Sequence, residues 1–150
     1  MLDSVKKEVE NLIKEYNLNC TIEEFKNRKA WKDIWIHKSL SEDFIREFQN
    51  EANWFWLSCY QNLSESFIRE FKDKVDWCNI SEYQKLSEEF IREFKDKVHW
   101  NRIFRHQILS PSFVEEFLEK INWEFAERYD LFHSDFIKKH KPVGSNIPAS

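Results

Sequence analysis

The sequence predicts an all-α protein, a short α-solenoid of about five 23-residue helix–turn–helix repeats with an N-terminal capping helix. The first observation is that a nearly constant segment recurs every 23 residues, most clearly from Leu40, Leu63 and Leu86. Units this short bury their apolar side chains only by stacking on neighbours, as helical repeats do. The second is that the chain of 150 residues has a single glycine. Hairpin turns and phosphate-binding loops depend on glycine, so strand-rich and nucleotide-binding folds are disfavoured.

Residues 1–16 predict the capping helix. Asp3 or Ser4 is the expected N-cap, because short polar side chains accept hydrogen bonds from the first free backbone N–H groups. Apolar side chains then follow at helical spacing. They are Val5, Val9, Leu12, Ile13 and Tyr16. A helix with one apolar stripe can cover the exposed end of the first repeat, which a repeat array requires.

The repeat array is expected over residues 17–140, with repeats starting at residues 17, 40, 63, 86 and 109 and a half repeat at 132–140. The first repeat is degenerate, because Thr21 replaces an aromatic residue. Thr21 and Glu24 have the spacing of a capping box, so Thr21 can begin a helix there. Residues 141–150 contain the only glycine and two of the three prolines, which predicts a disordered tail.

Each repeat is expected to contain two helices of about 10 and 8 residues. The first helix begins after a serine N-cap and buries a Phe–Ile stripe, while its charged residues form a solvated face. The serines are Ser41, Ser64, Ser87 and Ser110. The second helix begins after Asn53, Asp76 or Asn122 and buries a tryptophan, an aliphatic residue and a tyrosine, as in Trp54, Leu57 and Tyr60. His37 and His106 take the tyrosine position and are interpreted as packing variants.

Composition limits the possible partners and locations. A net charge of −4 and a pI near 5.8 argue against a protein that coats nucleic acid or an anionic membrane. No apolar run approaches the length of a membrane span, and residues 1–16 lack the apolar core of a signal peptide. Cys20, Cys59 and Cys78 are odd in number and show no CxxC pair, which favours reduced thiols in a cytoplasmic protein.

The repeat pattern LSEEFIREFKDKVDWxxISxYQ, followed most closely by Leu63–Gln84, resembles short tandem repeats of large DNA virus and phage proteins. The resemblance covers about residues 40–131. It implies a viral or mobile-element origin, a location in the host cell cytoplasm, and a binding role directed at a host protein. It supplies no functional residues.

The sequence predicts neither an enzyme nor a cofactor or metal site. Catalysis needs groups held at one point, whereas repeat residues are spread along an array. The five histidines follow no zinc-ligand spacing, and no nucleophile–base–orienter pattern occurs. We therefore expect a binding protein.

The second half of each repeat varies, and the variable positions are the candidate protein-binding residues. Exposed apolar side chains beside charges often mark an interaction site, and aromatic residues with arginine are typical of binding hot spots. The candidates are Trp35, Ile36, Phe55, Trp56, Asn79, Glu82, Arg102 and Arg105. An alternative is that Phe55 and Trp56 pack under the N-terminal helix and Phe125 under the half repeat. Trp35 could likewise serve packing or binding.

The leading functional hypothesis is a protein-binding repeat module that acts as a scaffold or as an inhibitor by occlusion. One alternative is nucleic-acid binding. Its basic residues would be Arg102, Arg105, His106, Lys138, Lys139 and Lys141. Another is an acidic mimic of nucleic acid. Its carboxylates would be Glu42, Asp43, Glu65, Glu88 and Glu89. Salt dependence separates a protein ligand from phosphate contacts, because counterion release makes phosphate binding steeply salt-dependent.

Overall fold

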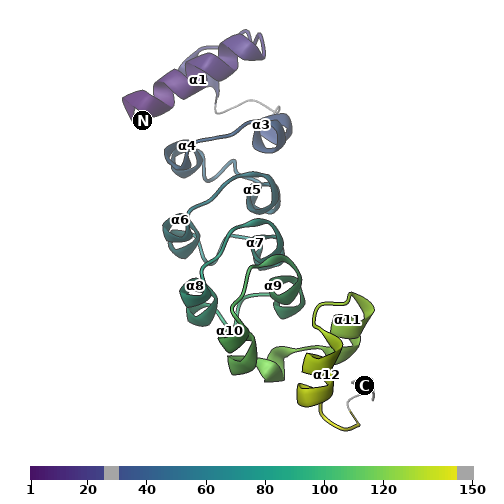
Figure 1. Ribbon diagram of the computed structural model, residues 1–150. Helices are drawn as coiled ribbons and strands as arrows, with labels where there is room; N and C mark the ends of the chain where they lie inside the picture. The colour runs from purple at the N-terminus through teal and green to yellow at the C-terminus, as the bar shows by residue number, and fades with distance from the viewer. Residues whose placement is uncertain (26–30, 145–150) are drawn as a thin grey trace. The chain divides into compact units, whose positions relative to one another are not determined.

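The computed structural model describes residues 1–25 and 31–144, and all regular elements in these ranges are helices (Figure 1). The all-α prediction is therefore confirmed. The chain divides into two compact units, Met1–Asn79 and Ile80–Ser150, called here the N-terminal and C-terminal units. Within the described ranges, no helix combines the length and the apolar character that a membrane span requires. Residues 145–150 of the predicted disordered tail lie outside the described residues.

The helices follow the 23-residue period of the sequence. They are α1 (Asp3–Glu15), α2 (Ile22–Phe25), α3 (Trp31–His37), α4 (Glu42–Glu47), α5 (Trp54–Tyr60), α6 (Glu65–Glu70), α7 (Trp77–Tyr83), α8 (Glu88–Glu93), α9 (Trp100–His106), α10 (Pro111–Glu116), a 3-10 turn (Leu118–Lys120), α11 (Trp123–Arg128) and α12 (Ser134–His140). From α5 to α11, each α-helix begins 23 residues after the equivalent helix of the preceding repeat, whereas α4 begins 20 residues after α2. A continuous solenoid through both units stays a prediction.

Helix α1 packs against α2 and α4 through Val5, Val9 and Leu12, which are buried as predicted. Its N-cap is Leu2, with no side-chain cap, so the expected cap at Asp3 or Ser4 is wrong. The helix begins one residue earlier, and Asp3 lies in the first turn, where its charge favours the positive helix end. The predicted capping box of α2 is confirmed, because Thr21 N–H donates to Glu24 Oε2 at 2.9 Å and Glu24 N–H to Thr21 Oγ1 at 3.2 Å.

The first helix of each repeat begins as predicted but is shorter. Each serine hydroxyl accepts a hydrogen bond from the N–H three residues later, and Pro111 occupies the first turn of α10. The helices have six residues rather than about ten, because a phenylalanine C-cap leaves the helical conformation. After α6 the chain forms a turn, in which Val75 N–H donates to Phe71 O at 3.1 Å. This turn directs Val75 into the core, where it is buried.

The second helices begin at the predicted caps, since Asn53, Asp76 and Asn122 each accept an N–H three residues later. Their buried face differs from the prediction. Tyr60, Tyr83 and Tyr129 are exposed, and so are His37 and His106, so their interpretation as packing variants is wrong. The tyrosine follows the tryptophan by six residues, which rotates it by about 120° from the stripe at i, i+3, i+4 and i+7. The tryptophans at 54, 77 and 100 are half-buried and Trp123 is buried, whereas the side chain of Trp31 lies outside the described residues.

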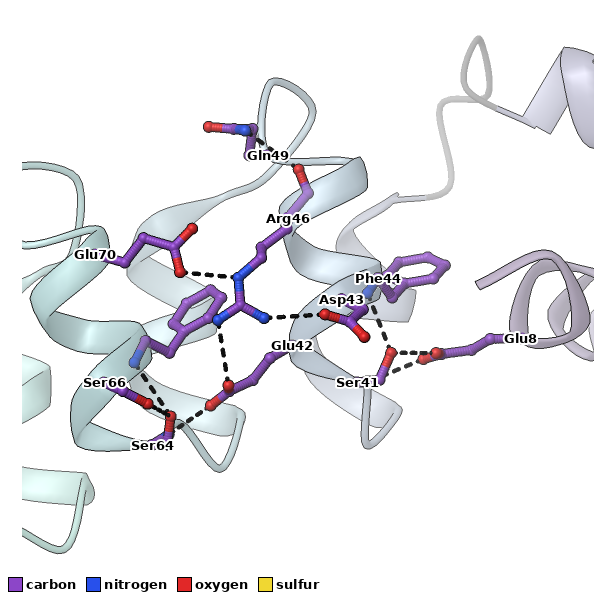
Figure 2. A network of polar contacts seen from close by, with 11 residues as sticks. Glu8, Ser41, Glu42, Asp43, Phe44, Arg46, Gln49, Ser64, Ser66 and Glu70 are labelled. Carbon is purple, nitrogen blue, oxygen red and sulfur yellow. Dashed lines mark hydrogen bonds and ion pairs between the residues drawn. The ribbon is translucent and has the colours of Figure 1, made fainter. Parts of the chain in front are cut away.

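Carboxylates bound to a serine cap join α1 to α4 and first helices of successive repeats within each unit. In the N-terminal unit, Glu8 accepts from Ser41 N–H at 3.0 Å, and Glu42 accepts from Ser64 N–H at 2.7 Å (Figure 2). Arg46 also bridges to the following helix, with Nε 2.9 Å from Glu70 Oε2 (Figure 2). The charged surface predicted to be only solvated therefore links neighbouring repeats.

Glutamine side chains join second helices within each unit, and Gln61 is buried. Gln61 Oε1 accepts from Leu40 N–H at 2.9 Å, and its Nε2 donates to the carbonyls of Trp35 and Lys38, both at 2.7 Å. In the C-terminal unit, Gln107 makes the equivalent three bonds. Its partners are Leu86 N–H and the carbonyls of Ser81 and Gln84. These amides satisfy backbone groups that the helix ends leave free.

The glutamine position also shows where the array changes. The residue 23 positions after Gln107 is Asp130, which adopts a φ of 49°. Leu131 N–H donates to Ala126 O at 2.9 Å, so α11 ends in a Schellman motif. Asn17, with a φ of 48°, ends α1 in the same way. The helices at the two ends of the array therefore terminate themselves, whereas α5 and α9 terminate on a glutamine that also holds the preceding repeat.

The carboxylate link predicts a specific acid sensitivity. The backbone N–H and the hydroxyl of Ser110 lower the pKa of Glu88 below its ordinary value of about 4.3, and Arg92 lowers it further. A carboxyl group with a lowered pKa stabilises the fold above its unfolded pKa, and this contribution is lost as the pH falls through the folded pKa. Glu88→Gln should therefore lower the melting temperature at pH 7, and the difference from wild type should shrink at pH 3.

The matched control is Glu89→Gln, since Glu89 lies in the same first turn but is exposed. Thermal unfolding of all three proteins, followed by circular dichroism from pH 7 to pH 3, makes the comparison. An equal change with pH for both variants would contradict a specific role of the Glu88–Ser110 link.

Candidate protein-binding surfaces

An exposed aromatic cluster lies on α5 in the N-terminal unit. Phe55 is 50% exposed and Tyr60 is 53% exposed, while Trp56 between them is half-buried. The ring centroids of Phe55 and Trp56 are 5.1 Å apart at 84°, and those of Trp56 and Tyr60 are 5.8 Å apart. These contacts, the first edge-to-face and the second tilted, hold the rings in place without burying them. We call Phe55, Trp56 and Tyr60 the α5 aromatic cluster.

The α5 helix presents this cluster because its other face is fixed in the core. Leu57 and Ser58 are fully buried, and Ser58 Oγ accepts from Asp76 N–H at 3.0 Å. The Trp54 ring is half-buried and lies 5.0 Å from the Phe71 ring. With these side chains facing inward, helix geometry turns Phe55 and Tyr60 outward. Phe55 is therefore not covered by the N-terminal helix, contrary to the packing alternative.

The other candidates in the N-terminal unit lie differently. Trp35 is 0% exposed, and its ring is 6.0 Å from the Phe44 ring, so it belongs to the core and not to a surface. Ile36 is half-buried. Asn79 is buried, and its Nδ2 donates to Phe55 O at 3.4 Å, which supports the backbone beneath the aromatic cluster. Of the four candidates in α3 and α5, Phe55 is thus the most accessible.

A pocket of about 270 Å³ lies between α9 and α11 in the C-terminal unit. Three candidate residues, Glu82, Arg102 and Arg105, converge there. The complete lining is Glu82, His99, Asn101, Arg102, Arg105, His106, Phe125 and Tyr129. Sequence reasoning did not predict the contributions of His99 and Tyr129. The 23-residue period could have identified Tyr129, because it is the next residue after His106 in the same repeat position.

The two arginines of this pocket differ in their partners. Arg102 forms an ion pair with Glu82, whose side chain is only 16% exposed. The Arg105 guanidinium lies over the Tyr129 ring, 4.2 Å from its centroid, and is exposed. Within the described part of the chain, Arg105 has no carboxylate partner. Arg102 is thus held by the protein itself, whereas the N–H donors of Arg105 are available to a ligand.

The pKa of His106, in the same pocket, is lowered by its surroundings. His106 Nε2 lies 4.0 Å from Glu82 Oε1. Partial desolvation of the ring, in a side chain that is 31% exposed, is the main cause that lowers the pKa of His106, and the positive charges of Arg105 and Arg102 lower it further. The lowered pKa favours the neutral imidazole at pH 7.

The residues of the two nucleic-acid alternatives are largely paired. Lys141 Nζ lies 2.8 Å from Glu127, and Lys139 lies 3.9 Å from Glu115. Among the proposed acidic ridge, Glu42 and Glu88 bind serine caps, and Arg92 Nη2 lies 3.8 Å from Glu88. A row of carboxylates that the protein itself satisfies is a poor mimic of free phosphates.

The C-terminal unit also has a larger apolar groove, of about 410 Å³, beside α12. Phe104 lies on its wall but is buried, with its ring 5.8 Å from that of Phe132. Phe104 therefore serves packing. Across residues 1–25 and 31–144, no group of three or more His, Cys, Asp or Glu side chains is arranged to hold a metal ion.

Comparison with known proteins gives no relative: no protein-family model matches the chain, and neither a curated protein nor a solved structure does.

Proposed function

We propose that the chain is a protein-binding helical repeat module whose second helices carry the contact residues. The observation that carries this proposal is the α5 aromatic cluster, with Phe55 and Tyr60 about half exposed on a helix whose other face is packed. Large aromatic side chains cost free energy in water, and they are the side chains that most often anchor protein interfaces.

The fixed geometry of the cluster supports this role. Phe55 and Tyr60 each contact Trp56, and Asn79 holds the backbone carbonyl of Phe55. Side chains that are already ordered lose little conformational freedom when a partner binds, so more of the contact energy appears as affinity. A module of this kind acts by covering part of its partner's surface, either as a scaffold or as an inhibitor by occlusion.

The test replaces Phe55 by serine. The full-length chain is immobilised, exposed to a lysate of the cells that produce it, and the captured proteins are quantified by mass spectrometry and then by affinity. Loss of a central aromatic anchor costs about 2 kcal/mol or more, so Phe55→Ser should weaken capture about 30-fold. The melting temperature should stay close to that of wild type, because half of the side chain is already exposed.

The matched control is Ile108→Ser, because Ile108 is 98% exposed and lies outside both the α5 aromatic cluster and the pocket between α9 and α11. It should leave capture unchanged. Equal capture by wild type and Phe55→Ser would contradict the proposal. A captured ligand that is nucleic acid, released with a steep salt dependence, would instead support the alternative based on Arg102, Arg105 and His106.

A further inference from the structure

The pocket between α9 and α11 has the size and lining of a small binding site. Its volume of about 270 Å³ equals that of about nine liquid water molecules. Asn101, Arg105 and His106 of α9 contribute polar groups to the lining, and Phe125 of α11 and its C-cap Tyr129 contribute aromatic rings. A ligand would therefore meet hydrogen-bond donors and ring faces together, the combination typical of specific pockets.

The charges of the lining sum to one free positive charge. With the two histidines of the lining, His99 and His106, counted as neutral, the ion pair of Arg102 with Glu82 leaves the charge of Arg105. The contact of Arg105 with the Tyr129 ring consumes none of its five N–H donors. An arginine in this situation presents two parallel N–H groups that match the two oxygens of a carboxylate.

The remaining lining distinguishes a carboxylate from a phosphate. Because Glu82 is already paired with Arg102, Arg105 is the arginine of the lining that can pair with an anion. Its single positive charge balances one carboxylate monoanion, whereas a phosphate dianion would leave an uncompensated negative charge in the pocket. Phe125 and Tyr129 add apolar surface beside the arginine.

We propose that this pocket binds one carboxylate of a protein partner, an Asp or Glu side chain followed by an apolar residue, through the guanidinium of Arg105. The inference rests on the proposed function, because it names the chemistry of the partner. The acidic group pairs with Arg105, and the adjacent apolar side chain packs against Phe125 and Tyr129. The site is distinct from the α5 aromatic cluster, so each can be tested without the other.

The experiment titrates the full-length ¹⁵N-labelled chain with the dipeptide Ac-Asp-Phe-NH₂ and follows the arginine Nε–Hε signals by NMR. The matched probe is Ac-Asn-Phe-NH₂, which has the same shape without the charge. The Asp peptide should shift the Arg105 signal saturably in the millimolar range, and the Asn peptide should bind at least tenfold more weakly. Arg105→Gln should reduce affinity for the Asp peptide at least tenfold.

The control variant is Arg128→Gln. Arg128 occupies the position of Arg105 one repeat later, but it lies 3.2 Å from Glu124 and outside this pocket. Its replacement should change affinity less than twofold. Equal binding of the Asp and Asn peptides, or unchanged affinity in Arg105→Gln, would overturn the proposal. Displacement of the Asp peptide by a dT₁₂ oligonucleotide with a steep salt slope would assign the pocket to phosphate.

Failure here is distinguishable from failure of the proposed function. Capture that depends on Phe55, with no peptide binding at Arg105, rejects only the carboxylate site. If the peptide binds at Arg105 but Phe55→Ser captures as much protein as wild type, the role of Phe55 as an anchor is rejected and the carboxylate site is supported.

Discussion

Gln61→Leu should lower the free energy of unfolding by about 3–5 kcal/mol. The Gln61 side chain is buried and makes three hydrogen bonds, to Leu40 N–H and to the carbonyls of Trp35 and Lys38. Leucine has a similar volume but cannot replace any of them. A buried polar group left without a partner costs about 1–3 kcal/mol, and three groups lose their partner together.

The matched control is Gln49→Leu, because Gln49 also uses both ends of its amide. Its Nε2 donates to Arg46 O at 3.2 Å, and its Oε1 accepts from Lys74 Nζ at 2.7 Å. These groups lie near the surface, so water can replace the lost bonds, and the cost should stay below about 1 kcal/mol. Urea unfolding followed by circular dichroism measures both. If Gln61→Leu and Gln49→Leu lowered the free energy of unfolding by similar amounts, Gln61 would not be a structural link between repeats.

The glutamine link shows why part of this fold could not be predicted from sequence. The caps, the Phe–Ile stripe and the repeat length follow from local rules, because each depends on residues within one helix turn or on a constant spacing. Gln61, Gln84 and Gln107 recur at the same spacing, yet a recurring polar residue at a helix end usually indicates a surface. The burial of Gln61 depends on the carbonyls of Trp35 and Lys38 in the preceding repeat, which no local pattern reveals.

The candidate site was predicted in part for the same reason. The variable half of each repeat does contain Phe55 and Arg105, which are exposed. Trp35 was misplaced, because its neighbours in the core come from a different repeat. The ion pair of Arg102 with Glu82 joins residues 20 positions apart, and this distance along the chain is bridged only when α7 and α9 are packed together. The sequence shows that the second half of each repeat varies, but tertiary packing determines which of its side chains are exposed.

Phe44→Ala should lower the free energy of unfolding by about 3–5 kcal/mol, the usual cost of removing a fully buried ring. Phe44 is 0% exposed, and its neighbours among the described residues include three aromatic rings. Its ring centroid is 4.6 Å from that of Phe48, 6.0 Å from that of Trp35 and 6.3 Å from that of Phe25. Because these aromatic rings come from α2, α3 and the end of α4, the cavity left by alanine cannot close through one side-chain movement.

The same substitution at Phe55 separates packing from binding. Phe55 is half exposed, so Phe55→Ala should cost less than about 1 kcal/mol of stability while it weakens partner binding. Both variants remove the same atoms, and denaturant unfolding therefore compares the two environments directly. If Phe55→Ala destabilised the chain as much as Phe44→Ala, the α5 aromatic cluster would be part of the core in solution, and the argument for a binding surface on α5 would fail. If Phe55→Ala destabilises the chain much less than Phe44→Ala, the Phe55 ring contributes little to the stability of the fold. The proposed binding role requires this result.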